Sequence, residues 1–170
     1  ASDKGTKPVT DPATEDKLAT IASATETDID AALQAAERGF QVWRKMGTWE
    51  RAAIIRKVAD LIRERVDLIA QAMSLETGKP LAEAKGETGA AADQFEWYSE
   101  ETKRIYGQII GSRTHDSRMA VIMQPVGVVA AFSAWNFPAL LPARKIAAAL
   151  AAGCSIIIKP AGETPASCAA

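Results

Sequence analysis

The spacing of apolar residues changes along the chain, and it predicts helices over the first two-thirds. Residues 1–25 combine turn-forming residues with short alternations such as LATIAS, which predicts an edge strand or an extended arm. Apolar residues then recur every three or four positions, which predicts amphipathic helices over residues 27–43, 51–61 and 65–75. Thr27-Asp28 is the expected start of the first helix, and Thr48 is a cap for the second.

A long Ala-rich stretch follows, and it predicts one helix over residues 81–106 packed inside the domain. Gly86 and Gly89 are small enough to let neighbouring helices approach closely. Bulky core contacts are expected from the large side chains of this stretch, because such side chains mostly go inside: Phe95, Trp97, Tyr98 and Ile105.

The last third changes to β-type patterning. Residues 107–124 hold two apolar segments around a polar turn, which predicts a β-hairpin; His115 lies in that turn as a solvated loop histidine. The short β-branched run over residues 126–132 predicts a strand buried on both faces. A helix over residues 140–152, ended by Gly153, and a second apolar strand over residues 155–159 complete a βαβ unit with parallel strands.

The predicted fold class is therefore α/β, with a helical layer around the start of a parallel sheet. Ligands of open α/β sheets bind beyond the carboxyl ends of the strands. Polar or aromatic residues occupy those ends in this sequence: Ser133, Trp135, Asn136, Lys159 and Glu163. Thr164 and Pro165 suit the start of one more helix, and so short a helix is not stable alone. We therefore expect the polypeptide to continue past Ala170.

Composition excludes several classes of function. The length of 170 residues suggests one domain, and a net charge of −1 gives no reason to expect nucleic acid or an anionic membrane as a partner. No apolar run approaches the length of about 20 residues that a membrane helix needs. Two cysteines make neither a disulfide framework nor a metal site, so a reducing, cytoplasmic setting is expected and no metal is predicted.

Several motifs resemble the aldehyde dehydrogenase superfamily. They are PVGVV (125–129), WNFP (135–138), ALAAGC (149–154) and KPAGETP (159–165), with ETGKP (76–80) as a further match upstream. The resemblance implies an N-terminal portion of that fold. It divides into a helical part of the cofactor-binding domain (1–106), a hairpin for oligomerisation (107–124) and the start of the NAD(P)-binding α/β core (125–170). A homodimer or homotetramer is implied, since an exposed apolar hairpin needs a partner to cover it.

The resemblance also implies roles for individual residues. Asn136 matches the donor that stabilises the oxyanion, although an asparagine that bonds its own turn is the alternative from local chemistry. Lys159 matches a ligand of the adenosine ribose; its alternative is a solvated surface lysine. The remaining residues expected to line the cofactor site, NAD or NADP, are Phe132, Ser133, Ala134, Trp135, Ala161, Gly162 and Glu163. Trp135 alternatively packs in the core.

Gly162 departs from the pattern of many NAD-preferring relatives. Those relatives carry a glutamate there, whose carboxylate accepts hydrogen bonds from the ribose hydroxyls. Because a carboxylate repels a 2′-phosphate and glycine does not, we expect NADP, or both cofactors, to be accepted. Glu163 is displaced by one position and need not point the same way.

Arg144 follows Asn136 by eight residues on the next helix. Two helical turns span about seven residues, so Arg144 projects on roughly the same side as the start of that helix. Members of the family that accept succinate semialdehyde carry an arginine at the matching position, and a guanidinium binds a carboxylate bidentately. The resemblance thus favours a semialdehyde with a distal carboxylate, with succinate semialdehyde first and 2-oxoglutarate semialdehyde second. The alternative is a surface or helix-pairing arginine.

The sequence offers no good nucleophile. Cys154 opens an apolar strand, and Cys168 has no nearby cation in the sequence to lower its pKa. The nucleophilic cysteine and general-base glutamate of the family belong to motifs absent from these residues. A non-catalytic fragment or a nucleotide-binding module therefore stays open as the alternative to an NAD(P)-dependent aldehyde dehydrogenase. A third possibility is a relative that forms an acyl-phosphate or an acyl-CoA.

Overall fold

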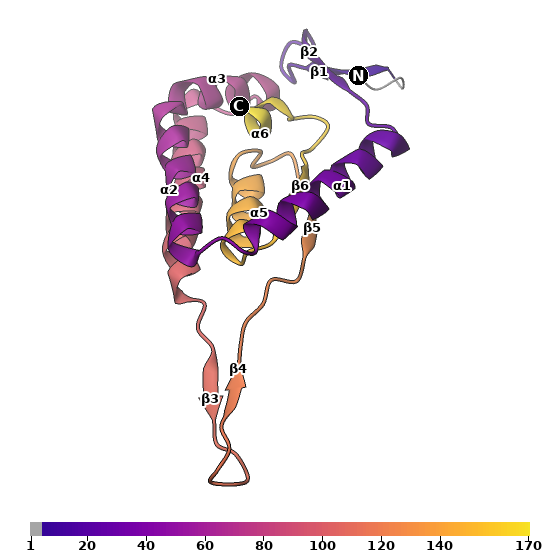
Figure 1. The fold of residues 1–170 in the computed structure, drawn as a ribbon. Helices are drawn as coiled ribbons and strands as arrows, with labels where there is room; N and C mark the ends of the chain where they lie inside the picture. Colours follow the sequence, from indigo (N-terminus) through magenta and orange to yellow (C-terminus); the bar gives the residue numbers. More distant parts are fainter. Residues whose placement is uncertain (1–4) are drawn as a thin grey trace.

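The computed structural model describes residues 5–170, which form helices around a short parallel sheet and a long protruding hairpin (Figure 1). In chain order the elements are β1 (Thr6–Thr10), β2 (Lys17–Ala22), α1 (Glu26–Trp43), α2 (Thr48–Glu64), α3 (Val66–Thr77), α4 (Leu81–Glu101), the 3₁₀ turn η1 (Thr102–Arg104), β3 (Gln108–Ile110), β4 (Met119–Val121), β5 (Val128–Phe132), α5 (Leu140–Ala151), β6 (Ser155–Lys159) and α6 (Ala166–Ala169).

The N-terminal segment is a β-hairpin, where the sequence predicted an edge strand or an extended arm. β1 and β2 pair antiparallel, with Thr6 opposite Ala22. The turn is closed by Asp11, whose Oδ1 accepts a hydrogen bond of 2.8 Å from the backbone N–H of Ala13. The predicted edge strand is thus paired with a second strand from the same short segment, residues 6–22.

Helix α1 begins at Glu26, one residue before the predicted start at Thr27, because Thr25 caps it. The Thr25 hydroxyl accepts from the backbone N–H of Asp28 at 3.2 Å, and the Asp28 carboxylate accepts from the backbone N–H of Thr25 at 2.8 Å. This reciprocal capping box satisfies two donors at the helix start. The same bond from the Thr25 backbone lowers the pKa of Asp28.

Helices α2, α3 and α4 form a layer beside α5 (Figure 1), and α4 contacts both α2 and α5. Their shared core is built from medium and small side chains: Ile55, Ala59, Ala91, Phe95, Ala143, Ala147 and Ala151. Small residues do allow close packing here, as expected, but they are alanines. Gly86 is exposed, and a Cβ built on Gly86 or Gly89 would contact nothing.

Three expectations for α4 are corrected. The helix ends at Glu101 and continues only as the turn η1, not to Tyr106. The Thr102 hydroxyl, which is buried, bonds back to the carbonyl of Tyr98 at 2.7 Å where the helix gives way to η1. Phe95 is buried and Tyr98 packs on the core, but Trp97 is 64% exposed and Ile105 is also exposed.

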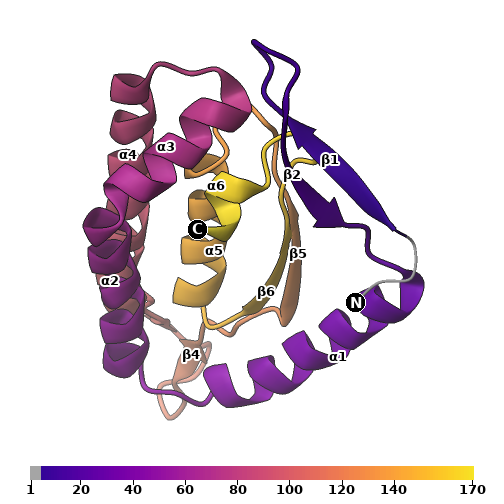
Figure 2. The ribbon, with the colours of Figure 1, turned by 90° about the horizontal axis from the view of Figure 1, so that it is seen from above.

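Strands β5 and β6 are parallel, with Val128 opposite Ser155 and Phe132 opposite Lys159, as the βαβ pattern predicted. Helix α5 lies on one side of them and α1 runs along the other (Figure 2). The strands are less buried than expected, and Phe132 is 70% exposed, because the described sheet has only these two strands. β5 also begins at Val128, since Gly127 has a φ of 124° that interrupts the extended run from Val126.

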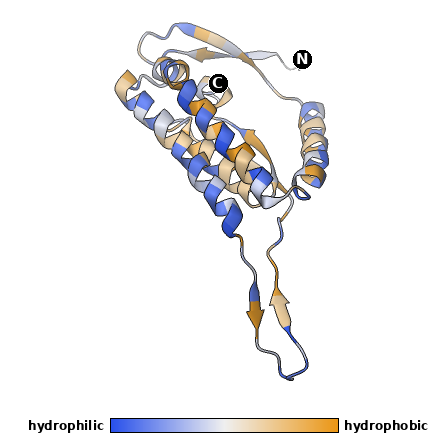
Figure 3. Ribbon diagram, turned by 60° about the vertical axis from the view of Figure 1, so that its left-hand side comes forward, coloured by the Kyte–Doolittle hydropathy of each residue, from blue (hydrophilic) through white to orange (hydrophobic). Residues whose placement is uncertain are grey.

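The predicted hairpin forms and projects away from the helices (Figure 3). β3 and β4 pair antiparallel, with Gln108 opposite Val121. All of their residues are exposed, and so is His115 in the turn between them. The apolar exposed side chains of this arm are Ile109, Ile110, Met119, Val121, Ile122 and Met123. Within residues 5–170, no helix has both the length and the apolar content to cross a membrane.

Two glycines near α3 and α4 give a matched test of this fold. Gly78 ends α3 with a φ of 72°, and a Cβ there would lie 3.3 Å from Pro12 Cγ. Gly78→Ala should lower the free energy of unfolding by about 1–2 kcal/mol, because L-residues rarely adopt this conformation. Gly86→Ala, inside α4, should raise it by about 0.5–1 kcal/mol through helix propensity. Urea unfolding of the two variants checks the opposite signs; equal effects would contradict the left-handed end of α3 at Gly78 or the helical conformation of Gly86.

Candidate functional site

The carboxyl ends of β5 and β6 meet, which places the predicted site residues of both strands side by side. Phe132 lies opposite Lys159 in the strand register, and the backbone N–H of Ser133 donates to the Lys159 carbonyl at 3.1 Å. The parallel pairing therefore continues one residue beyond β5. The chain then leaves the sheet through Ala134 and Trp135, which are exposed, so Trp135 is not a core residue among those described.

Asn136 stands in the turn between β5 and α5, with its side chain exposed. Sequence reasoning left open an asparagine that bonds its own turn, yet within the described residues its amide makes no hydrogen bond. Only its backbone carbonyl is engaged, by Lys79 Nζ at 3.2 Å. The turn is thus held through the main chain, and the side-chain N–H₂ stays available to an incoming oxygen. This is the chemistry required of an oxyanion donor.

Lys79 was not foreseen as part of this site. Its Nζ also forms an ion pair with the Glu87 carboxylate and lies 4.5 Å from the centre of the Phe137 ring. Lys79 belongs to the ETGKP turn between α3 and α4, far from WNFP in sequence. The ETGKP motif had indicated the family. Its local sequence, however, gives no indication that Lys79 contacts the carbonyl of Asn136.

Glu87 was missed as well, and it supplies the N-terminal cap of α5. The helix has no side-chain cap of its own. Glu87 Oε1 instead accepts from the backbone N–H groups of Ala139 at 3.0 Å and Leu140 at 3.2 Å. Glu87 is only 6% exposed, and a buried carboxylate requires partners of this kind. From sequence alone, a glutamate in the middle of an Ala-rich helix is expected to face solvent, which is why Glu87 was missed.

Glu76 performs the same task for α6. Its carboxylate accepts from the backbone N–H groups of Ala166 and Ser167, both at 2.8 Å, and from the Ser167 hydroxyl. Thr164, the predicted cap, instead donates its hydroxyl to the carbonyl of Trp135 at 3.4 Å. The segment after β6 is therefore tied both to α3 and to the segment after β5.

The residues after β6 have the properties that a nucleotide ribose requires. Lys159 is exposed at the strand end, and no hydrogen bond or ion pair of its ammonium occurs in the described part of the chain. Its N–H groups therefore remain free to donate to sugar hydroxyls. Ala161 is buried, whereas Gly162 and Glu163 are exposed, and a Cβ on Gly162 would meet no atom within 4 Å. This residue set fits a dinucleotide cofactor.

Arg144 lies on α5 one residue beyond Ala143, which faces the core. Its side chain is exposed, and the described residues provide it with no ion-pair partner. The helix-pairing alternative therefore has no contact to support it here. Arg144 stays available to an anion, and its predicted role remains a prediction.

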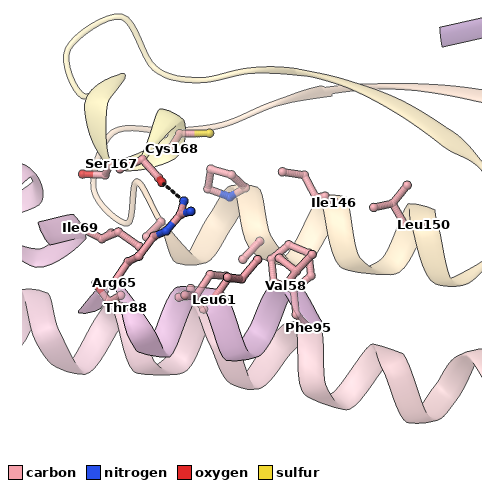
Figure 4. Close-up of a pocket in the computed structure, with 16 residues that line it drawn as sticks. Val58, Leu61, Arg65, Ile69, Thr88, Phe95, Ile146, Leu150, Ser167 and Cys168 are labelled. Atoms are coloured by element: carbon pink, nitrogen blue, oxygen red, sulfur yellow. Dashed lines mark hydrogen bonds between the residues drawn. The ribbon is translucent and has the colours of Figure 1, made fainter. Parts of the chain in front are cut away.

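A separate apolar pocket of about 340 Å³ lies between α2, α4 and α5, with α6 at one end (Figure 4). None of the predicted site residues lines it. Its polar groups are few, and Arg65 Nη1 bonds to the Ala170 carbonyl at 3.4 Å. Burial, and then the negative charge of Glu76, raise the pKa of the Cys168 thiol at its edge. A thiol of raised pKa is a poor nucleophile, so Cys168 is a poor candidate for the catalytic cysteine.

The chain belongs to the aldehyde dehydrogenase family, whose model matches residues 1–170. It is 48% identical over 157 residues to the succinate-semialdehyde dehydrogenase [NADP(+)] GabD of Escherichia coli, covering 92% of this chain and 33% of that protein. It is 48% identical over 162 residues to the 4-(hydroxymethyl)benzenesulfonate dehydrogenase TsaD1 of Comamonas testosteroni, covering 95% and 34%.

Solved structures agree with the fold. The crystal structure of succinate-semialdehyde dehydrogenase from Burkholderia pseudomallei superposes with a TM-score of 0.96 at 43% identity, covering 99% of this chain and 35% of that one. The α/β class and the resemblance to aldehyde dehydrogenases are thereby confirmed. The chain spans about a third of the length of these relatives.

Proposed function

We propose that the protein containing this chain oxidises an aldehyde to a carboxylic acid with NAD⁺ or NADP⁺. The observation that carries the proposal is the side-chain amide of Asn136, which has no hydrogen-bond partner among the described residues and lies in the turn after β5, the strand whose last residue pairs with Lys159 of β6. Membership of the aldehyde dehydrogenase family supports the reaction class. The oxidised nicotinamide, when bound, accepts the hydride that leaves the aldehyde carbon, and water supplies the second carboxyl oxygen.

In this reaction a thiolate adds to the aldehyde carbon, and negative charge develops on the former carbonyl oxygen. Asn136 donates its amide N–H to that oxygen, and loss of one such donor typically lowers the rate about 10²–10³-fold. Loss of hydride leaves a thioester, which water then hydrolyses. Cys154 is buried and the pKa of Cys168 is raised, so the thiolate belongs to another part of the protein.

Arg144 is the proposed selector of the substrate. A distal carboxylate on the aldehyde would pair with this exposed guanidinium through charge-assisted hydrogen bonds. The names of the relatives agree, since succinate semialdehyde and a benzenesulfonate both carry an anionic group away from the oxidised carbon. Succinate semialdehyde is the first candidate, and 2-oxoglutarate semialdehyde is the second.

We propose the cytoplasm as the compartment of the protein. Cys154 and Cys168 are both free thiols, and thiols stay reduced there. Fractionation of cells that make the protein would overturn this if the enzyme were recovered from an oxidising compartment.

Replacement of Arg144 tests the proposed substrate class. Charge-assisted hydrogen bonds contribute about 1.5–3 kcal/mol, so Arg144→Ala should raise KM for succinate semialdehyde about 10- to 150-fold. KM for an uncharged aldehyde such as butanal should change little. Steady-state kinetics of NAD(P)H formation measure both. Arg38→Ala removes another exposed arginine, on α1, and serves as the control. An equal loss for both aldehydes would contradict the role of Arg144.

Cofactor preference tests the proposed role of Gly162. With glycine there, kcat/KM for NADP⁺ should equal or exceed that for NAD⁺. Gly162→Glu should then lower kcat/KM for NADP⁺ by about tenfold or more, through repulsion of the 2′-phosphate. Gly162→Gln adds the same bulk without the charge and should lower it less. A wild-type preference for NAD⁺ by orders of magnitude would refute NADP⁺ use.

The protruding hairpin supports a homodimer or homotetramer as the assembly. Ile109, Ile122 and Met123 are exposed on this arm, and a second copy would remove them from water. Ile109→Asp together with Ile122→Asp should shift the protein toward monomer, because burial of an unpaired carboxylate is unfavourable. Sedimentation velocity measures the change, and Glu15→Asp with Thr20→Ser, outside this arm, is the control. A monomeric wild type would overturn the proposal.

A further inference from the structure

The Lys79 ammonium joins three groups around the turn that holds Asn136. It pairs with the Glu87 carboxylate, donates to the Asn136 carbonyl at 3.2 Å, and lies over the Phe137 ring at 4.5 Å. The ammonium thus contacts the main chain of Asn136 itself and the side chain of the next residue. Lys79 does not contact the side-chain amide, which points to an indirect role.

The other two supports of this turn also come from elements that are remote in sequence. Glu87 holds the first turn of α5 through the N–H groups of Ala139 and Leu140, and Thr164 holds the carbonyl of Trp135. The residues on both sides of Asn136 are therefore fixed from α4 and from the segment after β6. The carbonyl of Asn136 itself depends on Lys79 among the described side chains.

The Lys79–Glu87 pair is shielded from water, and this makes it more than a surface contact. The side chains are 15% and 2% exposed, so both lose hydration and require each other and the neighbouring backbone groups. The Glu87 carboxylate also meets the positive end of the α5 dipole. Loss of the ammonium would leave the Asn136 carbonyl without this donor while α5 remained capped.

We propose that Lys79 is a positioning residue for the oxyanion donor: its bond to the Asn136 carbonyl, with Glu87 as anchor, sets where the Asn136 amide points. The inference rests on the proposed aldehyde oxidation. An amide donor contributes only when it lies about 2.7–3.1 Å from the developing oxyanion. A displacement of 1 Å in such a group can lower a rate about 10²-fold.

The test is a double-mutant cycle in the protein that carries this chain. Lys79→Met removes the ammonium and keeps the apolar stem. It should lower kcat for aldehyde oxidation about 10- to 100-fold, with KM for NAD(P)⁺ within about twofold of wild type. In the Asn136→Ala background the same change should lower kcat by less than about threefold, because the donor that Lys79 positions is already gone.

Two further variants serve as a control and as a substitute for Lys79→Met. Lys57→Met removes a lysine of an exposed ion pair on α2 and should leave kcat within about twofold of wild type. Glu87→Gln keeps an acceptor for Ala139 and Leu140 but removes the anchor of Lys79. If Lys79→Met does not fold, Glu87→Gln replaces it in the double-mutant cycle with Asn136→Ala. The same non-additive loss of kcat is expected.

The possible results separate this inference from the function on which it rests. A wild-type enzyme that oxidises no aldehyde would overturn the proposed function, and the positioning role with it. An active wild type whose Lys79→Met variant stays within threefold would overturn the positioning role alone. Equal losses with and without Asn136 would do the same, because a merely structural lysine acts independently of that amide.

Discussion

The site depends on two buried carboxylates that satisfy the helix starts of another part of the chain. Helices α5 and α6 follow the two strands that carry the site, and neither has a side-chain cap of its own. Glu87 and Glu76 accept the N–H groups of those first turns from α4 and α3. Buried N–H groups without acceptors are strongly unfavourable, so the helical layer is required for the geometry at the strand ends.

The residues that hold these helix starts and the Asn136 turn precede them in the chain. The helical layer comes first, and its ETGKP turn supplies Glu76 to α6 and Lys79 to the Asn136 turn. Within this turn the Ser74 hydroxyl donates to the Lys79 carbonyl at 2.7 Å, and Gly78 adopts the left-handed conformation. One short motif therefore contacts two segments of the site, through Glu76 and through Lys79. The helical layer thus directs three polar side chains, Glu76, Lys79 and Glu87, to the segments that follow β5 and β6.

Much of the fold follows from local patterning. The helices over the first hundred residues, the β3–β4 hairpin and the parallel β5–α5–β6 unit are all predicted by the spacing of apolar residues, because each period matches one backbone geometry. The errors lie at ends and surfaces. Helix α1 begins one residue before the predicted start because Thr25 and Asp28 form a capping box, and Trp97 is exposed although its chemistry favours burial.

The sequence by itself determined which residues stand at the strand ends, since strand length and turn chemistry place Asn136 and Lys159 there. It also determined the family, through WNFP and KPAGETP. Only the tertiary structure decided what holds these residues in place. Lys79 and Asn136 are 57 positions apart, and Glu76 and Ser167 are 91 apart. Pairings at such separations depend on how helices pack, and no local period in the sequence encodes them.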